Sequence, residues 1–202
     1  MFRTLLISLC LTSTALATTW TVDDDGKADF DNIQAAVDAA SDGDEIIVMP
    51  GTYTGTAYEV VNMLGKAVWL HSSEGQEVTI IDGEGVHRGI ACTNGETLNT
   101  VIEGFTITNG YSGYGGGMFN SNSSPTLTEC TFDSNSANSH GGGMSNYGGS
   151  PTLTTCTFEG NFAGIGGGMC NENSSPTLTD CAFTDNSAIY GGGGMHNWSS
   201  SS

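Results

Sequence analysis

The stretch "GGGMFNSNSSPTLTECTFDSNSA", residues 115–137, decides the fold because most of it recurs along the chain. The tract Gly-Gly-Gly-Met appears with its methionine at 118, 144, 169 and 195, so the interval is 26, 25 and 26 residues. Ser-Pro, Thr-Leu-Thr, a cysteine and Phe-x-x-Asn travel with the tract. Self-similarity at a fixed period of this length is typical of stacked supersecondary units, so we expect a solenoid.

The residue types indicate which solenoid. Each unit is rich in Gly, Ser, Thr and Asn, which are poor helix formers, and short pieces such as "SPTLT" alternate apolar and polar positions as strands do. We therefore predict an all-β parallel β-helix with about 25 residues per coil, each coil holding three short strands and three turns. Consecutive coils pair in parallel about 4.8 Å apart, so each residue lies on its counterpart one period later.

Comparison between the repeats predicts which positions face inward. Columns that stay identical and apolar are expected in the core, whereas the position after each methionine varies and is expected outside. The inward columns are Met118, Met144, Met169 and Met195; Leu127, Leu153 and Leu178; Cys130, Cys156 and Cys181; and Phe132, Phe158 and Phe183. The variable column reads Phe119, Ser145, Cys170 and His196. The polar position before each cysteine, Glu129 in the first copy, predicts a corner there.

Two further residue types have expected structural roles. The column Asn135, Asn161 and Asn186 is predicted to form an asparagine ladder whose amides bond from coil to coil. The in-line cysteines are expected to be buried free thiols rather than disulfides, because stacked side chains point the same way. Cys170, in the variable column, is expected to be outward and available for reaction or crosslinking. His140 and His196 are expected on the surface.

The repeat decays upstream, but strand patterns continue through 101–118, 78–85, 67–72 and 45–53. Residues 18–44 are expected to supply a first strand and a capping helix over 31–40, with Asp31 and Gln34 as a capping box. Regular repeats begin at about residue 101 and the β-helix spans 45–202. Each complete repeat has a proline seven residues after its methionine, which predicts a proline at position 202, where the sequence has a serine. We interpret the chain either as part of a longer repeat protein or as having an open end for end-to-end self-association.

Composition narrows the partners. Residues 1–17, with Arg3 before an apolar run, read as a secretory signal peptide, so we expect a secreted or cell-surface protein. Against 22 Asp and Glu the chain has only 4 Lys and Arg, for a net charge of −18, which disfavours nucleic acids and anionic lipid as partners. No apolar stretch is long enough for a transmembrane helix. The sequence indicates no cofactor. Calcium is an open alternative, because some of the carboxylates could hold it, and the residues that would bind a metal stay unknown.

The residues also resemble known families. The segment "DDDGKADFDNIQAAVDAASDGDEIIVMPGTY", residues 23–53, resembles the amino-terminal part of pectin-lyase-like right-handed parallel β-helix proteins. The GGGM and Phe-x-x-Asn repeats resemble those of chlamydial polymorphic outer-membrane proteins. The resemblance implies a right-handed β-helix. The resemblance does not predict one function, because lyases, hydrolases, esterases and adhesins all share this fold.

Enzyme chemistry has few candidate residues. A lyase of this fold uses a basic residue to remove a proton from carbon, and the candidate here is Arg88, with Asp82 and Glu84 at a calcium ion. The alternative is a structural role, in which Arg88 lies on a loop and neutralises local acids. A hydrolase needs paired carboxylates, and Glu129 and Asp180 occupy equivalent positions two coils apart. We consider a polysaccharide lyase or hydrolase the alternative to the main hypothesis, which is a non-enzymatic adhesive, structural or carbohydrate-binding module.

A third hypothesis is ice binding. Thr-x-Thr on three successive coils predicts a grid of about 6.7 by 4.8 Å, although the corner near Glu129 is expected to bend the second threonine column away. The outward residues proposed to bind a polysaccharide or a cell-surface ligand are Phe119, Thr126, Thr128, Glu129, Thr152, Thr154, Thr177 and Thr179.

Overall fold

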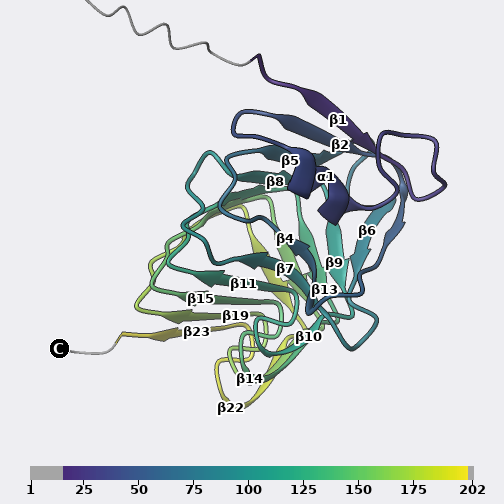
Figure 1. The fold of residues 1–202 in the computed structure, drawn as a ribbon. Coiled ribbons are helices and arrows are strands. Elements are labelled where there is room, and N and C mark those ends of the chain that lie inside the picture. Colours follow the sequence, from purple (N-terminus) through teal and green to yellow (C-terminus); the bar gives the residue numbers. More distant parts are fainter. Residues whose placement is uncertain (1–15, 200–202) are drawn as a thin grey trace, which may run out of the picture.

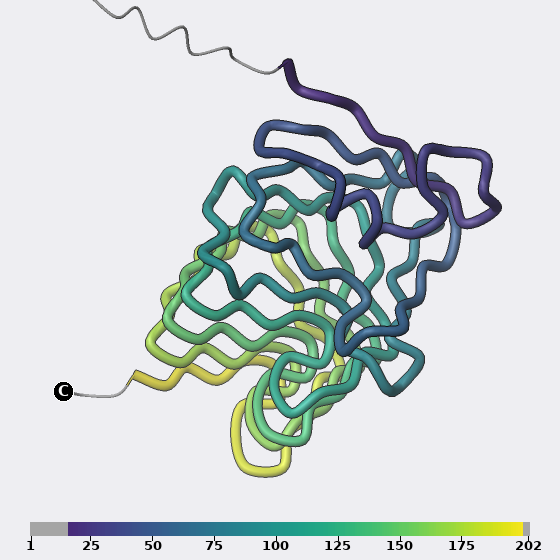
Figure 2. The backbone as a smooth tube through the Cα atoms, viewed as in Figure 1, coloured from purple at the N-terminus to yellow at the C-terminus, as the bar shows by residue number. Residues whose placement is uncertain are grey.

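The computed structural model describes residues 16–199, so nearly all of the predicted leader over residues 1–17 lies outside the described part. The described chain is a parallel β-helix of about 7 turns with about 26 residues per turn, as the sequence predicts. Its coils stack from the first strand to the last (Figure 2). Within residues 16–199, no helix has the length and apolar character needed to span a bilayer.

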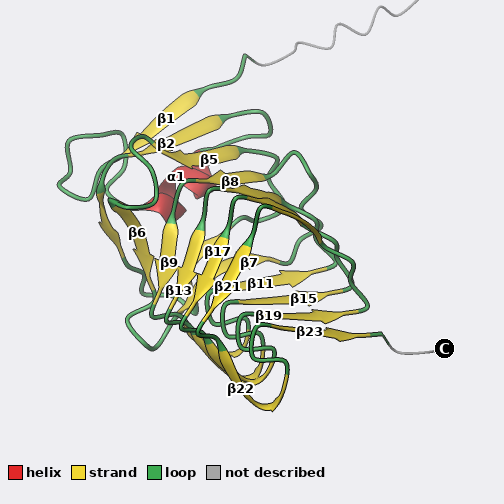
Figure 3. Cartoon of the chain, turned by 180° about the vertical axis from the view of Figure 1, so that it is seen from behind, coloured by secondary structure: helices red, strands yellow, loops and turns green. Residues whose placement is uncertain are grey.

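Three parallel sheets enclose the core, and each is named here after a residue that recurs in it (Figures 1 and 3). The threonine sheet consists of β1 (Thr19–Val22), β2 (Glu45–Val48), β5 (Trp69–Ser72), β8 (Val101–Glu103), β12 (Thr126–Thr128), β16 (Thr152–Thr154) and β20 (Thr177–Thr179). The phenylalanine sheet consists of β3 (Gly51–Tyr53), β6 (Thr79–Asp82), β9 (Thr106–Thr108), β13 (Thr131–Asp133), β17 (Thr157–Glu159) and β21 (Ala182–Thr184). The methionine sheet consists of β4 (Glu59–Asn62), β7 (Arg88–Cys92), β11 (Met118–Ser121), β15 (Met144–Tyr147), β19 (Met169–Glu172) and β23 (Met195–Trp198).

A fourth sheet corrects the prediction of three strands per coil. We call it the arm; it consists of β10 (Tyr111–Tyr114), β14 (Ser136–His140), β18 (Phe162–Ile165) and β22 (Ser187–Gly191). Each of its strands leaves the phenylalanine sheet and returns to the methionine sheet, so the arm projects beside the stack (Figure 1). Its register shifts between Ala137 and His140, and a bulge there accounts for the coil that is one residue shorter. Such irregular spacing hides the strand from a search for alternation.

The core is built from columns of identical residues, as the repeat comparison predicts. Phe132 stacks on Phe158 with ring centres 4.7 Å apart and planes 6° from parallel, and Phe158 stacks on Phe183 at the same distance. Met118 pairs with Met144 in register, and both are fully buried. This spacing equals the distance of about 4.8 Å between strands, because identical side chains on neighbouring parallel strands repeat at the strand separation.

A short helix, α1 (Ile33–Ala39), packs against β1, β2 and β4 at the first coil. Ile33, Ala36 and Val37 are buried, so one face of α1 covers the apolar end of the stack. The predicted capping box was wrong by one residue. The N-cap is Asn32, whose side chain accepts a hydrogen bond from the backbone N–H of Ala35 (2.8 Å), while the Gln34 amide pairs with the backbone of Asn62 on β4.

The corners are held by backbone geometry and by asparagine ladders. Glu129, Thr155 and Asp180 all adopt positive φ, which makes the predicted corner between the threonine and phenylalanine sheets. At a second corner, the Asn135 side-chain amide donates to Asn161 Oδ1 (3.1 Å) and to the backbone oxygen of Ile107 (2.8 Å). Asn161 repeats both contacts with Asn186 and Phe132. These amides satisfy buried backbone groups that no strand partner reaches.

The column of asparagines that follows the methionines forms a second ladder. The Nδ2 of Asn120 donates to Asn146 Oδ1, Asn146 to Asn171, and Asn171 to Asn197, each at 2.7 Å. This ladder runs along the inner end of the methionine sheet. The two ladders together tie the regular coils to one another through side chains as well as through backbone pairing.

Candidate functional site

The arm folds toward the outer face of the methionine sheet and leaves a groove between them. The first glycine of each Gly-Gly-Gly tract makes the reversal possible: Gly141 has φ +65°, and a Cβ there would collide with the backbone carbonyl of Met144. Glycine adopts positive φ without steric cost, so the predicted geometric role of these tracts explains them here. The groove therefore exists because the chain turns sharply at every coil.

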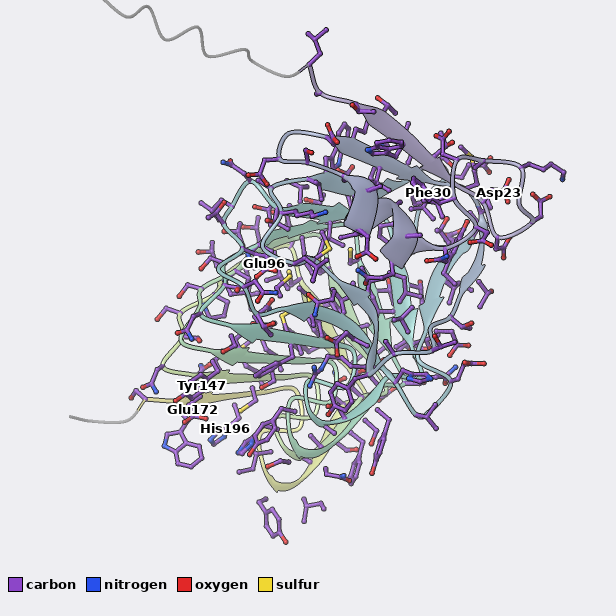
Figure 4. All side chains as sticks on the ribbon, in the orientation of Figure 1. Asp23, Phe30, Glu96, Tyr147, Glu172 and His196 are labelled. Atoms are coloured by element: carbon purple, nitrogen blue, oxygen red, sulfur yellow. The ribbon has the colours of Figure 1, made fainter. Side chains whose placement is uncertain are left out.

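Three columns of side chains line the groove region. Nearest the corner on the methionine sheet lie Phe119, Ser145, Cys170 and His196, which pair in register. Two residues further along the same strands lie Ser121, Tyr147, Glu172 and Trp198. On the arm, Tyr114 pairs with His140, which pairs with Ile165. Figure 4 shows Tyr147, Glu172 and His196 on the same side of the molecule.

The groove has a volume of about 450 Å³ and is lined by Tyr114, Phe119, Ser121, Ser145, Tyr147 and Glu172. Tyr114 and Tyr147 are 48% and 46% exposed, so their rings border the opening. Aromatic rings continue beyond it: Tyr114 stacks on His140 with centres 5.3 Å apart, and His140 lies 6.1 Å from Trp198. The site thus combines several ring faces with hydroxyl groups and one carboxylate.

Arg88 lies behind the groove and corrects the expectation that it sits on a loop. It is on β7, only 8% exposed, with its guanidinium between the rings of Tyr58 and Phe119, 5.0 Å from each ring centre. It donates to the backbone oxygens of Gly115 and Tyr114 and to Ser112 Oγ, at 2.9–3.1 Å. Burial lowers the pKa of Arg88 below its ordinary value. Because these three hydrogen bonds hold the base of the arm and the guanidinium packs on the Phe119 ring, this residue positions Tyr114 and Phe119.

Cys170 corrects a second expectation. It lies on the outer side of the methionine sheet but is only 2% exposed, because the arm covers it. Ala91 on the methionine sheet and Ala137 and Ala163 on the arm are likewise buried without belonging to the main core, so small residues of the sheet and of the arm form a thin second layer. Burial raises the pKa of the Cys170 thiol to about 11, which makes the reactive thiolate scarce near neutral pH.

The in-line cysteines lie where the sequence places them. Cys130 and Cys156 are fully buried, Cys181 is half-buried in the last coil, and all five cysteines among residues 16–199 are free thiols. Each thiol of the column points at backbone carbonyls, as Cys130 does toward Thr128 at 3.4 Å. The neighbouring Cys130 thiol and burial together raise the pKa of Cys156.

The structure separates the predicted binding residues. Of these, only Phe119 lines the groove, where it is half-buried. The six threonines lie on the threonine sheet, away from the arm, and Glu129 is exposed at the corner beside that sheet. Both threonine columns stand on one strand, with Thr126 against Thr152 and Thr128 against Thr154, so the expectation that a corner bends the second column away was wrong. The corner begins only at Glu129.

Sequence reasoning missed the groove residues Tyr114, Tyr147 and Glu172. The column two residues after the variable one reads Ser121, Tyr147, Glu172 and Trp198, and its mixture of aromatic and acidic residues was the available signal. The signal could not be interpreted from the sequence, because the opposite wall of the groove is formed by the arm, which the sequence did not predict. The acids considered for catalysis lie elsewhere: Asp82 accepts from Asn109 Nδ2 (3.1 Å) and from the backbone of Glu84 (2.7 Å).

Comparison with known proteins supports the fold. A family model described as the right-handed beta helix region matches residues 52–202. The chain belongs to this right-handed β-helix family. The match covers more than half of the chain and includes every coil that contributes to the groove. No curated protein matches the chain.

Membership of the right-handed β-helix family shows the scaffold but assigns no site. Among the described residues that line the groove, Glu172 is the one carboxylate, and no group of three or more His, Cys, Asp and Glu within residues 16–199 is arranged to hold a metal ion. What the groove can do chemically follows from ring faces, hydroxyl groups and that single negative charge.

Proposed function

We propose that the protein is a secreted or cell-surface module that binds carbohydrate without cleaving it, and that the arm groove holds a neutral oligosaccharide segment. The observation that carries this proposal is the pair of half-exposed rings, Tyr114 and Tyr147, on opposite walls of a groove that also holds Ser121, Ser145 and Glu172. Sugar rings have apolar faces and polar edges. Aromatic walls with a few polar groups match both features.

Charge selects the kind of sugar. With a net charge of −18 and Glu172 within the groove, the protein repels uronates and sulfated sugars. The only described positive charge next to the site is Arg88, whose donors are engaged by the arm. A neutral or amino-substituted polysaccharide is therefore the preferred ligand class.

The export signal and the repeats support a surface location. Residues 1–17 have the charge and apolar run of a signal peptide, and the GGGM and Phe-x-x-Asn repeats resemble those of chlamydial outer-membrane proteins. An adhesive module on a cell surface fits both features. A lyase or hydrolase remains the alternative. A hydrolase ordinarily uses two carboxylates, whereas the described lining of the groove holds one. A lyase of this fold uses a basic residue, and the donors of Arg88 are engaged by the base of the arm.

Binding to an array of neutral and acidic glycans, followed by calorimetry on the best oligosaccharide, tests the proposal. We expect Tyr147→Ala to weaken binding at least tenfold, which corresponds to about 1.4 kcal/mol. The matched control is Tyr190→Ala, because Tyr190 is 81% exposed at the tip of the arm and lies outside the groove. Equal affinity of the two variants, or binding of acidic glycans alone, would contradict the proposal. Shortening of the bound oligosaccharide during the experiment would favour the enzyme.

Ice binding is the second candidate, favoured by one observation. Thr126, Thr152 and Thr177 pair in register on the flat threonine sheet, and Thr128, Thr154 and Thr179 form a parallel column. Thermal hysteresis of the purified protein, and its loss in Thr152→Tyr, is the test. A protein without measurable hysteresis removes this candidate and leaves the groove proposal untouched.

A further inference from the structure

Trp69 is an exposed aromatic residue that the structure holds in one orientation. It points outward from β5 on the threonine sheet and is 42% exposed. Its indole N–H donates to Glu103 Oε2 at 3.0 Å, and the His71 ring stacks on it with centres 4.1 Å apart and planes 23° from parallel. His71 Nε2 lies 3.0 Å from Glu45 Oε1. Glu103 on the adjacent strand β8 and His71 on β5 itself thus fix the indole plane before any ligand arrives, and Glu45 on β2 holds His71.

A hollow of about 570 Å³ borders this indole. It is lined by Asp42, Gly43, Asp44, Ala67, Trp69, Leu98, Asn99 and Val101. Apart from Val101, the other lining residues precede Trp69 or its paired positions along their coils, whereas His71 follows it on β5, so the ring face turned away from His71 borders the hollow. Leu98 also borders it and is 56% exposed. The hollow therefore has an aromatic wall and a separate apolar side chain, both accessible from solvent.

Polar groups with remaining hydrogen-bonding capacity lie in the same hollow. Asp42 uses Oδ1 to accept from the backbone N–H of Ala67 (2.9 Å), and within residues 16–199 its Oδ2 and the side-chain amide of Asn99 have no hydrogen-bond partner. Asp44 differs, because its two oxygens already accept three hydrogen bonds, from Thr18, Ser41 and Trp20. Asp42 and Asn99 are therefore the groups that can meet hydroxyls of a ligand.

We propose that this hollow is a second carbohydrate-binding site, which takes one neutral sugar ring of a polysaccharide. The apolar face of the ring stacks on Trp69, Leu98 contacts its edge, and its hydroxyls donate to Asp42 and pair with Asn99. Asp42, Asp44 and Glu103 around the hollow oppose a uronate or a sulfated sugar. An indole whose N–H is already bonded loses little freedom on binding, which favours affinity.

The site is independent of the groove, since Trp69 stands on the threonine sheet whereas the groove lies between the arm and the methionine sheet. Two sites on one rigid scaffold raise the avidity for an insoluble polysaccharide, because the second contact becomes intramolecular. The threonine columns lie on the same flat face as Trp69, with Thr126 and Val101 continuing its column. A polysaccharide chain or fibre lying on this face would extend over them.

One experiment reports both sites separately. The chain has three tryptophans, Trp20, Trp69 and Trp198, so the ¹H–¹⁵N spectrum of the full chain contains three indole signals, which Trp→Phe substitutions assign. Titration with soluble neutral oligosaccharides of glucose, mannose, xylose and galactose should shift the Trp69 signal in a saturable manner for at least one of them. The indole N–H of Trp20 donates to Asp44, which lines the hollow, so its signal should follow that of Trp69. The backbone amide of Tyr190, at the exposed tip of the arm, serves as the internal reference.

Two variants distinguish a site from a surface residue. Leu98→Ala and Asn99→Ala should each raise the oligosaccharide concentration at half-saturation of the Trp69 signal at least fivefold, whereas Tyr147→Ala should leave it unchanged. Because Leu98 and Asn99 are exposed, both variants should keep the wild-type spectrum elsewhere.

The outcomes separate the two proposals. A Trp69 signal that responds to none of the oligosaccharides, or a response that Tyr147→Ala abolishes, overturns the second site. Backbone amide signals of the groove residues Tyr147 and Glu172 that stay still while Trp69 responds contradict the groove and leave the second site standing.

Discussion

The guanidinium of Arg88 lies 5.0 Å from the centre of the Phe119 ring, and the same guanidinium donates to the backbone of the arm. Arg88 therefore contacts both walls of the groove, the methionine sheet through Phe119 and the arm through the backbone of Tyr114. Tyr58 encloses it from the other side, and Glu59 lies 3.7 Å from Nη1 as its charge partner. The groove therefore depends on one buried cation that a ligand does not need to touch.

Replacement of Arg88 by methionine should destabilise the protein by about 3 kcal/mol, because it removes the counter-charge of the partly buried Glu59 and the hydrogen bonds to the arm. Arg88→Lys should recover only part of this loss, since an ammonium cannot reproduce the guanidinium fork. Urea unfolding followed by circular dichroism measures both. Lys27→Met is the control, because the Lys27 side chain is 77% exposed, and a comparable loss there would contradict the assignment.

The sharp corner before the methionine sheet predicts a difference between two glycines. Gly141→Ala should cost about 2–4 kcal/mol, because φ is positive and the new Cβ meets the backbone of Met144. Gly113→Ala, on the arm, has no atom within 4 Å of the new Cβ and no positive φ, so stability should stay within about 0.5 kcal/mol of the wild type. Thermal melting of the two variants side by side decides the point; similar melting temperatures would refute it.

The asparagine ladder predicts that the side-chain amide of Asn161, at its centre, contributes more to the stability of the fold than the exposed amide of Asn138. Asn161→Ala removes the acceptor for both the backbone and the side chain of Asn135 and the donor to Phe132, so unfolding should become easier by about 2–4 kcal/mol. Asn138→Ala, at an exposed position on the arm whose side chain hydrogen-bonds with Tyr111 alone among residues 16–199, should change stability by less than about 0.5 kcal/mol. If chemical denaturation curves of the two variants coincide, the ladder does not stabilise the fold.

Burial of the thiols predicts slow alkylation and a loss of stability in alkali. Iodoacetamide at pH 8, read by mass spectrometry, should modify Cys181 first among the cysteines of residues 16–199, because the other four are buried. Cys170 has its pKa raised to about 11, so the folded state keeps a proton that the unfolded chain loses near pH 9. Its contribution to stability is therefore complete below pH 9 and falls as the pH rises toward 11.

The control for this effect is Cys170→Ala. In that variant the free energy of unfolding should fall less steeply between pH 9 and pH 11 than in the wild type, where Cys170 adds its own ionisation to that of the other groups. Rapid labelling of Cys170 in the native protein at pH 8 would show that the arm opens readily and does not shield the methionine sheet.

The sequence by itself determined the solenoid, its coil length and most of its interior. In a parallel stack every residue repeats over its counterpart, so identity between repeats at Met118 and Met144, or at Phe132 and Phe158, directly identified the core. The corner at Glu129 followed from the break in alternation between Leu127 and Cys130, and the structure adds that the backbone there has positive φ. These features are local and periodic, and one chain holds enough copies to reveal them without any other protein.

Only the tertiary structure decided where a site can lie. The arm strands are short, bulged and variable, so nothing in their sequence shows that they fold back over the methionine sheet. That fold buries Cys170, supplies hydrogen-bond acceptors to Arg88, and places Tyr114 across from Tyr147. The orientation of Trp69 likewise depends on Glu103 and His71, on its own and an adjacent coil. Periodicity reports which side of a strand a residue occupies, whereas contact between separate faces depends on how the coil turns in space.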